Sequence, residues 1–248
     1  MKTSLSVNVN AIAFLRNRRN LPWPSVEGLA KLALESGADG ITIHPRPDER
    51  HIRRDDVQVL ERLLRLNFPD REYNIEGYPS DDFLDLVCRT KPDQVTFVPD
   101  TPDQSTSDHG WDVIANADLL QAATERVKKH GIRVSFFIDE DPDVPALCKA
   151  AGADRIEIYT APYGSAFTSE AIQLHLENLQ NTAGAATRAG LQVNAGHDLT
   201  LQNLPALKSA IPQLAEVSIG HALISDALAL GLPATIKAYG EALRTKEG

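Results

Sequence analysis

The chain has 248 residues, 42% of them hydrophobic, and a formal net charge of −9, which suits one large domain such as an α/β barrel. This acidic balance, without a broad basic face carrying aromatics, excludes nucleic acid as a partner. No run of about 18 apolar residues predicts a membrane span, and the first residues lack a signal-peptide pattern, so we expect a cytoplasmic protein.

In a repeated pattern, a helical segment ends at glycine and a short β-branched strand follows. It occurs at Gly37, Gly131, Gly152 and Gly190, because glycine adopts the left-handed conformation at a helix end at little cost. In chain order the predicted strands lie near residues 4–10, 40–44, 72–77, 94–98, 133–139, 155–161, 191–196 and 215–220. The predicted helices lie near 25–36, 55–67, 80–90, 112–130, 142–151, 168–189 and 200–210, and after 222. Their candidate N-cap residues are Ser25, Ser80, Asp112, Thr168 and Thr200.

The predicted strands are apolar nearly throughout and alternate with the helices. Such strands are typical of a parallel sheet covered on both faces. Eight such units predict a single-domain (β/α)8 TIM barrel with extra helices over residues 1–248. A doubly wound open sheet is the alternative, although no GxGxxG motif follows the first strand. Cys88 and Cys148 lie in predicted helices without metal-binding spacing, so we expect free thiols and no metal site.

Polar side chains gather at the carboxyl ends of the predicted strands, where barrel enzymes place their chemistry. In chain order these positions are Asn8, Asn10, Arg19, His44, Arg46, Arg50, His51, Asn74, Glu76, Asp100, Thr106, Ser107, Asp139, Glu157, Thr160, His197 and His221. We interpret this convergence as a shared cavity mouth. The long segment 99–111 is a candidate lid.

These residue types suit acid–base chemistry on phosphorylated small molecules. A carboxylate such as Glu76 or Glu157 in an apolar strand has a raised pKa unless it is paired, and histidine titrates near neutral pH. Arg46 can hold phosphate in bidentate fashion. The turns NAGH and SIGH stand where barrels commonly bind phosphate through backbone N–H groups.

Some of these residues have a structural alternative. His51 or His221 could serve only to hydrogen-bond a loop, and Glu157 could be a satisfied structural acid. We expect Arg16, in the run LRNRRN, to lie in a solvated turn. The joint occurrence at successive strand ends, and no single residue, favours an active site.

Seven segments between residue 5 and about residue 225 form a recognisable set: VNVNAIAFLRNRR, GADGITIHPRPDERHI, YNIEG, VSFFID, IEIYTAPY, VNAGHDLT and VSIGHALI. Together they resemble the pyridoxine 5'-phosphate synthase family of vitamin B6 biosynthesis. The resemblance implies a barrel that assembles as a homo-octamer and needs no metal or organic cofactor. It implies condensation of 3-amino-2-oxopropyl phosphate with 1-deoxy-D-xylulose 5-phosphate, giving pyridoxine 5'-phosphate, phosphate and water.

The resemblance also implies roles for single residues. The acid–base catalysts of the family match His44, Glu76 and His197. The positions that hold deoxyxylulose phosphate match Arg46, His51 and Thr106. The positions that hold the aminoketone phosphate match Asn8, Arg19, Gly220 and His221. Two further substrate-binding candidates beside these motifs are Asn10 and Asp198.

The chain departs from the family's commoner pattern at these last two positions. The first-strand motif is commonly Asn-x-Asp-His and here reads Asn8-Val9-Asn10-Ala11, while Asp198 stands where glycine is frequent. A homologue that binds phosphorylated ligands without turnover is therefore a second hypothesis. A third is an isomerase or aldolase acting on one sugar phosphate, although no lysine suited to Schiff-base chemistry stands at a strand end.

Overall fold

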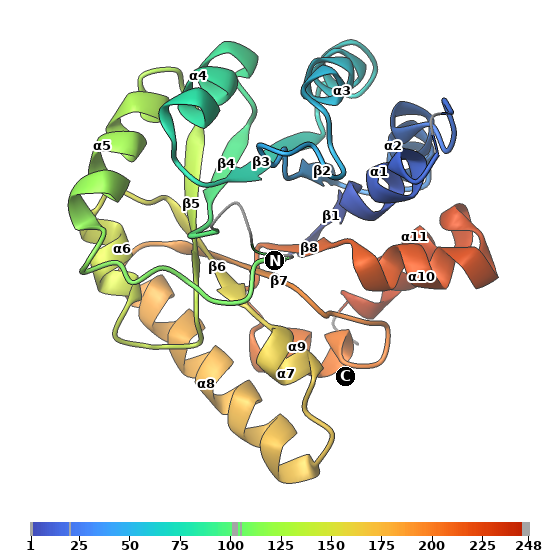
Figure 1. Cartoon of the computed structure of the whole chain (residues 1–248). Coiled ribbons are helices and arrows are strands. Elements are labelled where there is room, and N and C mark those ends of the chain that lie inside the picture. The colour runs from blue at the N-terminus through green and yellow to red at the C-terminus, as the bar shows by residue number, and fades with distance from the viewer. Residues whose placement is uncertain (1, 20, 101–103, 105, 245–248) are drawn as a thin grey trace.

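The computed structural model describes residues 2–19, 21–100, 104 and 106–244. Its eight strands form a closed parallel barrel in chain order, and β1 pairs with β8 to complete it (Figure 1). The strands are β1 (Ser4–Asn8), β2 (Gly40–Ile43), β3 (Glu72–Gly77), β4 (Gln94–Phe97), β5 (Arg133–Ile138), β6 (Arg155–Tyr159), β7 (Gln192–Gly196) and β8 (Glu216–Ile219). The (β/α)8 barrel predicted from the sequence is confirmed, and the open sheet is wrong.

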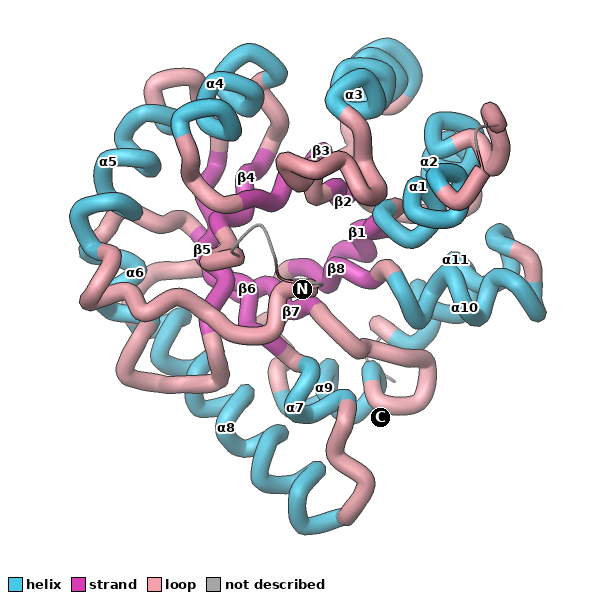
Figure 2. Tube along the Cα trace, viewed as in Figure 1, coloured by secondary structure: helices cyan, strands magenta, loops and turns pink. Residues whose placement is uncertain are grey.

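The helices lie outside the ring of strands (Figure 2). Those of the described residues are α1 (Asn10–Asn17), α2 (Val26–Glu35), α3 (Arg54–Asn67), α4 (Asp81–Thr90), α5 (Ala117–Lys128), α6 (Pro145–Ala150), α7 (Ala161–Gly164), α8 (Ser169–Arg188), α9 (Leu204–Ala210), α10 (His221–Leu230) and α11 (Leu232–Ala242). Because each crossover helix returns the chain to the same end of the barrel, the carboxyl ends of all eight strands open on one face.

Three of the five candidate N-cap residues cap helices as predicted. The side chains of Ser25, Ser80 and Thr168 accept hydrogen bonds from the first turns of α2, α4 and α8. Asp112 and Thr200 instead accept backbone N–H bonds in turns that precede α5 and α9. Those two helices therefore begin later than the cap signals indicated.

The helices α1, α7 and α11 were not predicted as separate elements. The strand expected over 4–10 ends at Asn8, and α1 begins almost at once at Asn10. Four residues, as in α7, are too few to show a helical period. Gly231, with φ of 78°, separates α11 from α10, so one predicted carboxyl-terminal helix is two.

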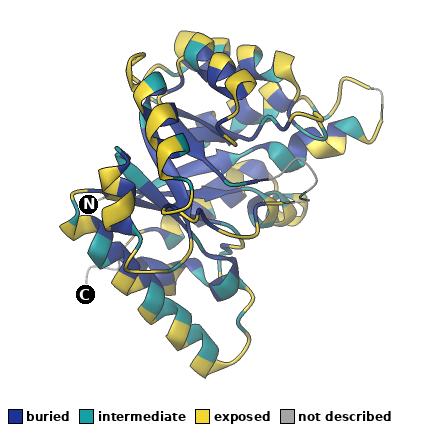
Figure 3. Ribbon diagram, turned by 60° about the vertical axis from the view of Figure 1, so that its left-hand side comes forward, coloured by how far each residue is buried: buried dark blue, intermediate teal, exposed yellow. Residues whose placement is uncertain are grey.

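The strands alternate between apolar side chains packed under the helices and polar side chains inside the barrel. Val7 and Ile75 are fully buried in the apolar core, whereas Thr42 contacts the Ser6 hydroxyl and accepts a bond from Asn74 inside the ring. This alternation follows from the two-residue period of a strand. Figure 3 shows the strands buried and the outer helix faces exposed.

Both cysteines are free thiols in helices, as predicted. Cys148 is buried and Cys88 is half-buried, and burial raises the pKa of the Cys148 thiol to about 12. Within the described ranges, no helix has the length and apolar character needed to cross a membrane.

Candidate active site

A cavity of about 370 Å³ opens at the carboxyl ends of the strands. Eleven of the twelve predicted site residues line it: Asn8, Asn10, His44, Arg46, His51, Glu76, Thr106, His197, Asp198, Gly220 and His221. Arg19 does not line it and lies exposed after α1. The structure therefore brings the predicted site together with one exception.

Arg16 is buried, so its predicted place in a solvated turn is wrong. Its guanidinium makes two bonds to the Asp56 carboxylate of α3, at 2.5 and 2.9 Å, and a third to the carbonyl oxygen of His51 at 3.0 Å. The run LRNRRN reads as a polar turn in sequence. Its described residues instead lie in α1 and directly after it, and the Arg16 side chain reaches α3 from that helix.

The loop between β2 and α3 is held by α1, and this fixes His51. The side-chain amide of Asn17 donates to the carbonyl oxygens of Glu49, Arg50 and His51 at 3.1, 3.2 and 2.7 Å. The backbone N–H of Ile52 donates to Nδ1 of His51 at 2.9 Å. The neutral imidazole therefore carries its proton on Nε2, which can donate to a ligand.

A histidine and a glutamate lie together in the cavity. Nδ1 of His44 is 3.9 Å from Oε2 of Glu76, and both side chains are buried. The backbone N–H of His44 donates to Oδ1 of Asn10 at 3.0 Å, and the ring centroids of His44 and His51 are 6.2 Å apart. His44 is thus contacted by the first residue of α1 and by the loop that follows β2.

Burial shifts the pKa values of the acids and the histidine in the cavity. It raises the pKa of Glu76 well above its usual value, with further contributions from Glu157 and Asp100, and it raises the pKa of Glu157 to about 7. Burial and then the Arg46 charge lower the pKa of His44 well below its usual value. Burial therefore favours the protonated form of Glu76 and the uncharged form of His44, which are a proton donor and a proton acceptor.

Glu157 also belongs to the site. From the sequence it could be either a catalytic acid or a structural one. It lines the cavity, is 2% exposed, and its Oε2 has no hydrogen-bond partner among the described residues. A side chain at Gly196 would place its Cβ 2.3 Å from Oε1 of Glu157. Only glycine on the neighbouring strand leaves room for this carboxyl. In the sequence, the only sign of this role was a carboxylate within the largely apolar strand RIEIY.

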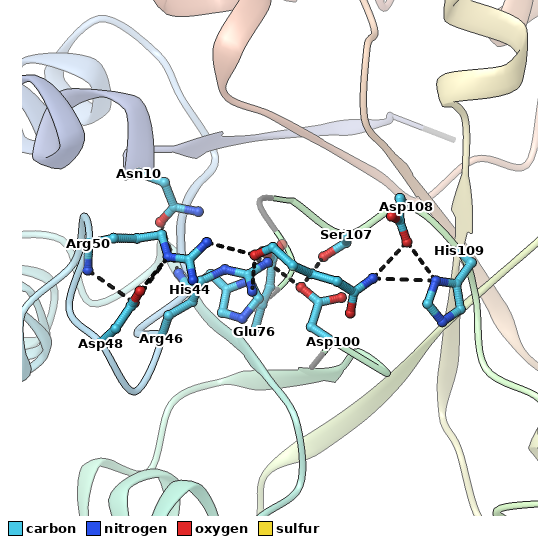
Figure 4. Close-up of polar contacts among 11 residues, drawn as sticks. Asn10, His44, Arg46, Asp48, Arg50, Glu76, Asp100, Ser107, Asp108 and His109 are labelled. Carbon is cyan, nitrogen blue, oxygen red and sulfur yellow. Dashed lines mark hydrogen bonds and ion pairs between the residues drawn. The ribbon is translucent and has the colours of Figure 1, made fainter. Parts of the chain in front are cut away.

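Arg46 is already paired in the cavity wall. Its guanidinium forms a buried ion pair with Asp100 and donates to the carbonyl oxygen of Gln104 at 3.2 Å (Figure 4). Arg50 donates to the same carbonyl oxygen at 2.6 Å, and Ser107 donates to Asp100 at 2.7 Å. The arginines therefore hold the segment after β4 against the loop after β2. Asp100 and Ser107, both buried, had no assigned role in the sequence resemblance.

The candidate lid of residues 99–111 is described only in part, because residues 101–103 and 105 lie outside the described ranges. Thr106 and Ser107 line the cavity. The backbone N–H of Gly110 donates to Asp139 at the end of β5, at 2.9 Å. A Cβ at Gly110 would lie 2.2 Å from the backbone nitrogen of Asp139. The carboxyl end of this segment is thus anchored.

The turn of residues 196–199, here called the His197 turn, has an unusual backbone. His197 and Asp198 have φ of 80° and 53°, in the left-handed region that favours glycine. The imidazole of His197 contacts the rings of both Phe137 and Tyr159, at centroid distances of 5.1 and 5.4 Å. Burial lowers its pKa, against the opposing charge of Asp198.

Backbone N–H groups that suit an anion lie at two places along the cavity. Those of His197, Asp198 and Leu199 have no acceptor among the described residues, and the amino terminus of α10 begins at His221. Gly220 lies close to β1, since a Cβ there would be 3.1 Å from the Cβ of Asn8. Unpaired N–H groups and a helix amino terminus favour phosphate.

From the cysteine spacing in the sequence, no metal site was expected. In the described part of the chain, no three His, Cys, Asp or Glu side chains are grouped to hold a metal ion. The cavity instead combines buried carboxyl and imidazole groups with backbone N–H donors. Fold and site together define a (β/α)8 barrel whose strand ends surround a cavity lined by carboxyl, imidazole and backbone N–H groups, an arrangement suited to acid–base chemistry.

Comparison with known proteins places the chain within that class. Residues 5–245 match the family model described as pyridoxal phosphate biosynthesis protein PdxJ, and the chain belongs to this family. A pyridoxine 5'-phosphate synthase of Mesorhizobium japonicum is 58% identical over 95% of this chain and 96% of that protein. Another, of Brucella anthropi, is 54% identical over 98% of this chain and 100% of that protein.

Solved structures of lower identity share the fold. The YdjI aldolase of Escherichia coli has a TM-score of 0.64 at 14% identity, covering 98% of this chain and 89% of that one. A tryptophan synthase alpha-subunit of Pyrococcus furiosus has a TM-score of 0.63 at 16% identity, covering 98% and 99%. At this identity the likeness concerns the barrel alone.

Proposed function

We propose that this chain is a pyridoxine 5'-phosphate synthase. It condenses 3-amino-2-oxopropyl phosphate with 1-deoxy-D-xylulose 5-phosphate into pyridoxine 5'-phosphate and inorganic phosphate, and atom balance requires two molecules of water as well. The observation that carries the proposal is the buried pair of His44 and Glu76, in one cavity with Glu157 and His197. The names of the relatives at 54–58% identity agree with it.

The reaction needs several proton transfers at different atoms. An amine adds to a carbonyl, a carbinolamine loses water, phosphate is eliminated and a ring closes. Loss of water requires a proton on the departing hydroxyl, and a protonated Glu76 can donate it. An uncharged His44 can accept a proton from carbon or nitrogen, and we assign His197 as donor at the opposite wall. Glu157, with a pKa of about 7, can serve in either direction.

The two phosphorylated substrates need separate anion sites. We assign deoxyxylulose phosphate to the side of Arg46, His51 and Thr106. The aminoketone phosphate takes the side of Asn8, Gly220 and His221, near the N–H groups of the His197 turn. Arg19 belongs to this second site only if the exposed segment that carries it moves toward the cavity. Holding both substrates in one cavity supplies the entropic advantage of an intramolecular reaction.

Asn10 and Asp198 are the substrate contacts particular to this chain. Because Oδ1 of Asn10 accepts the N–H of His44, its amide NH2 remains to donate to a substrate oxygen. Asp198 lines the cavity, and we assign it to the aminoketone side. The assembly is proposed to be a homo-octamer in the cytoplasm, with no metal or organic cofactor. Light scattering coupled to gel filtration tests the octamer through the mass of the particle.

A turnover assay tests the function. Purified chain is incubated with both substrates, and pyridoxine 5'-phosphate and inorganic phosphate are quantified together. Each substrate alone is the control. We expect the two products in equal amounts only when both substrates are present. Binding of both without product would contradict the proposal and favour a ligand-binding homologue.

A further inference from the structure

The His197 turn is held by a side chain that lies outside the cavity lining. The hydroxyl of Thr160, at the junction of β6 and α7, contacts the carbonyl oxygens of Gly196 and His197 at 2.6 and 2.5 Å. Its backbone N–H also donates to the Gly196 oxygen at 2.9 Å. Thr160 is fully buried. A hydroxyl has one proton to donate, so the two carbonyl groups share it.

This contact orients the peptide groups on either side of His197. In a trans peptide the N–H points opposite to the C=O. With the His197 carbonyl directed at Thr160, the N–H of Asp198 is turned away from Thr160. The same contact fixes where the His197 side chain leaves the backbone. One hydroxyl therefore controls both an imidazole and an anion-binding amide of the cavity wall.

Holding the turn matters because its backbone is unfavourable for these residues. Left-handed φ is disfavoured for residues with a side chain, and Asp tolerates it better than most. Here two such residues follow one another, His197 and Asp198. Asn203 adds a bond from its amide to the Asp198 carbonyl oxygen at 2.9 Å. Gly164 packs directly on Asp198, since a Cβ there would lie 2.6 Å from the Asp198 Cβ.

We propose that Thr160 is a positioning residue that holds the His197 turn, and through it the His197 imidazole, in the geometry needed for proton transfer. The proposal rests on the proposed function insofar as His197 is a proton donor in that reaction. It deepens that function by assigning the support of the catalytic group to a residue that does not line the cavity.

The first test compares two substitutions at one position. Thr160→Val keeps the shape and the backbone N–H but removes the hydroxyl, whereas Thr160→Ser keeps the hydroxyl. We expect Thr160→Val to lower kcat by about tenfold to a hundredfold, as small displacements of catalytic groups do. Thr160→Ser should retain kcat within about threefold of native. Thr235→Val is the matched control, because Thr235 is equally buried and donates to the Gly231 carbonyl oxygen in α11.

The second test uses the strain itself. Glycine takes the left-handed conformation without steric cost, so Asp198→Gly should let the turn keep its shape without the hydroxyl. The measured quantity is the ratio of two kcat values, with Thr and with Val at position 160. We expect this ratio to be several-fold smaller in the Asp198→Gly background than in the native one. A ratio that is the same in both backgrounds would overturn the proposal, whatever Asp198→Gly does by itself.

A third readout is independent of turnover. The imidazole signals of His197 in a ¹H–¹³C spectrum, assigned by their loss in His197→Asn, should move and titrate differently in Thr160→Val and return in Thr160→Ser. An unchanged His197 spectrum in a folded Thr160→Val protein, or kcat within about twofold of native, would refute the positioning role. If the native chain makes no pyridoxine 5'-phosphate, the proposed function fails, and these spectra still decide the role of Thr160.

Discussion

Nδ1 of His44 faces Oε2 of Glu76 across 3.9 Å inside a buried cavity. The distance is too long for a direct hydrogen bond, and a substrate atom or one water could bridge it. The opposite pKa shifts of the two groups both favour the uncharged form, the protonated acid of Glu76 and the neutral imidazole of His44. An uncharged pair can accept a proton at one member and release one at the other without creating a buried net charge.

Replacing Glu76 by glutamine should abolish most turnover while leaving the fold intact. Glutamine has the same shape but cannot exchange a proton, and general acid–base groups contribute about 10²–10⁴-fold to rate. We expect kcat to decrease by a factor in that range. Calorimetry should show that both substrates still bind. Glu125→Gln on the exposed face of α5 is the control. A Glu76→Gln enzyme with native kcat would show that the buried acid is structural.

Removing Arg46 should affect both stability and one substrate. Arg46→Ala leaves the buried Asp100 carboxylate without its cation, and such unpairing costs about 3–5 kcal/mol. The double variant Arg46→Ala with Asp100→Asn should recover part of that loss in denaturant unfolding. Among folded variants, the KM for deoxyxylulose phosphate should rise more than the KM for the aminoketone phosphate. Equal changes in the two KM values would count against the assigned side of the cavity.

Glu157 should impose a measurable pH dependence on stability. Its pKa is about 7 in the fold and near 4.5 when unfolded, so the folded state binds more protons between these values. Its favourable contribution is complete below pH 4.5 and is lost as the pH rises toward 7, by at most about 3 kcal/mol. Glu157→Gln should therefore gain stability relative to the native chain between pH 4.5 and 8.

The comparison with the native chain is needed because histidines act in the opposite direction. The pKa of His51 is lowered to about 4 by burial and then by Arg46, so its contribution is lost as the pH falls from 6.5 toward 4. Subtracting the two unfolding curves cancels this effect. A difference between Glu157→Gln and native that stays constant from pH 4.5 to 8 would contradict the raised pKa of Glu157.

Asn10 should matter through a neutral contact and not through proton transfer. Asn10→Ala removes the acceptor of the His44 N–H and a donor to substrate. We expect substrate binding about tenfold weaker or less, from the loss of one neutral substrate contact worth about 0.5–1.5 kcal/mol. The pH profile of kcat should keep its shape. Asn10→Asp restores the acceptor but adds a charge, and it should shift that profile. If Asn10→Ala shifted the pH profile of kcat, Asn10 would take part in the proton transfers, against this prediction.

The barrel was predictable from the sequence because its signals are local. A glycine at the end of four of the helical segments, as at Gly152 or Gly190, and the β-branched run that follows mark where a strand begins. Polar residues at the ends of those runs, such as His44 and His197, locate the cavity, since strand ends of a barrel share one face.

Other features could not be predicted because they depend on contacts between distant segments. Arg16 reads as solvated until its guanidinium is known to reach Asp56 of α3. The bond between Asn10 and the His44 N–H requires the placement of β1 beside β2. Nothing in the letters NAGHD shows that His197 and Asp198 are left-handed, because both residue types usually adopt negative φ. Thr160 gains its importance only from that backbone.

The contact between Asn8 of β1 and Gly220 after β8 joins the first and last strands of the ring. One end of the cavity is therefore assembled from the earliest and the latest parts of the chain to leave the ribosome. A nascent polypeptide that still lacks β8 has most of its helices but no closed ring and no complete phosphate site. Ligand binding during synthesis can thus begin only after the final strand has emerged, and a chain truncated before β8 would expose the unpaired edge of β1 to aggregation.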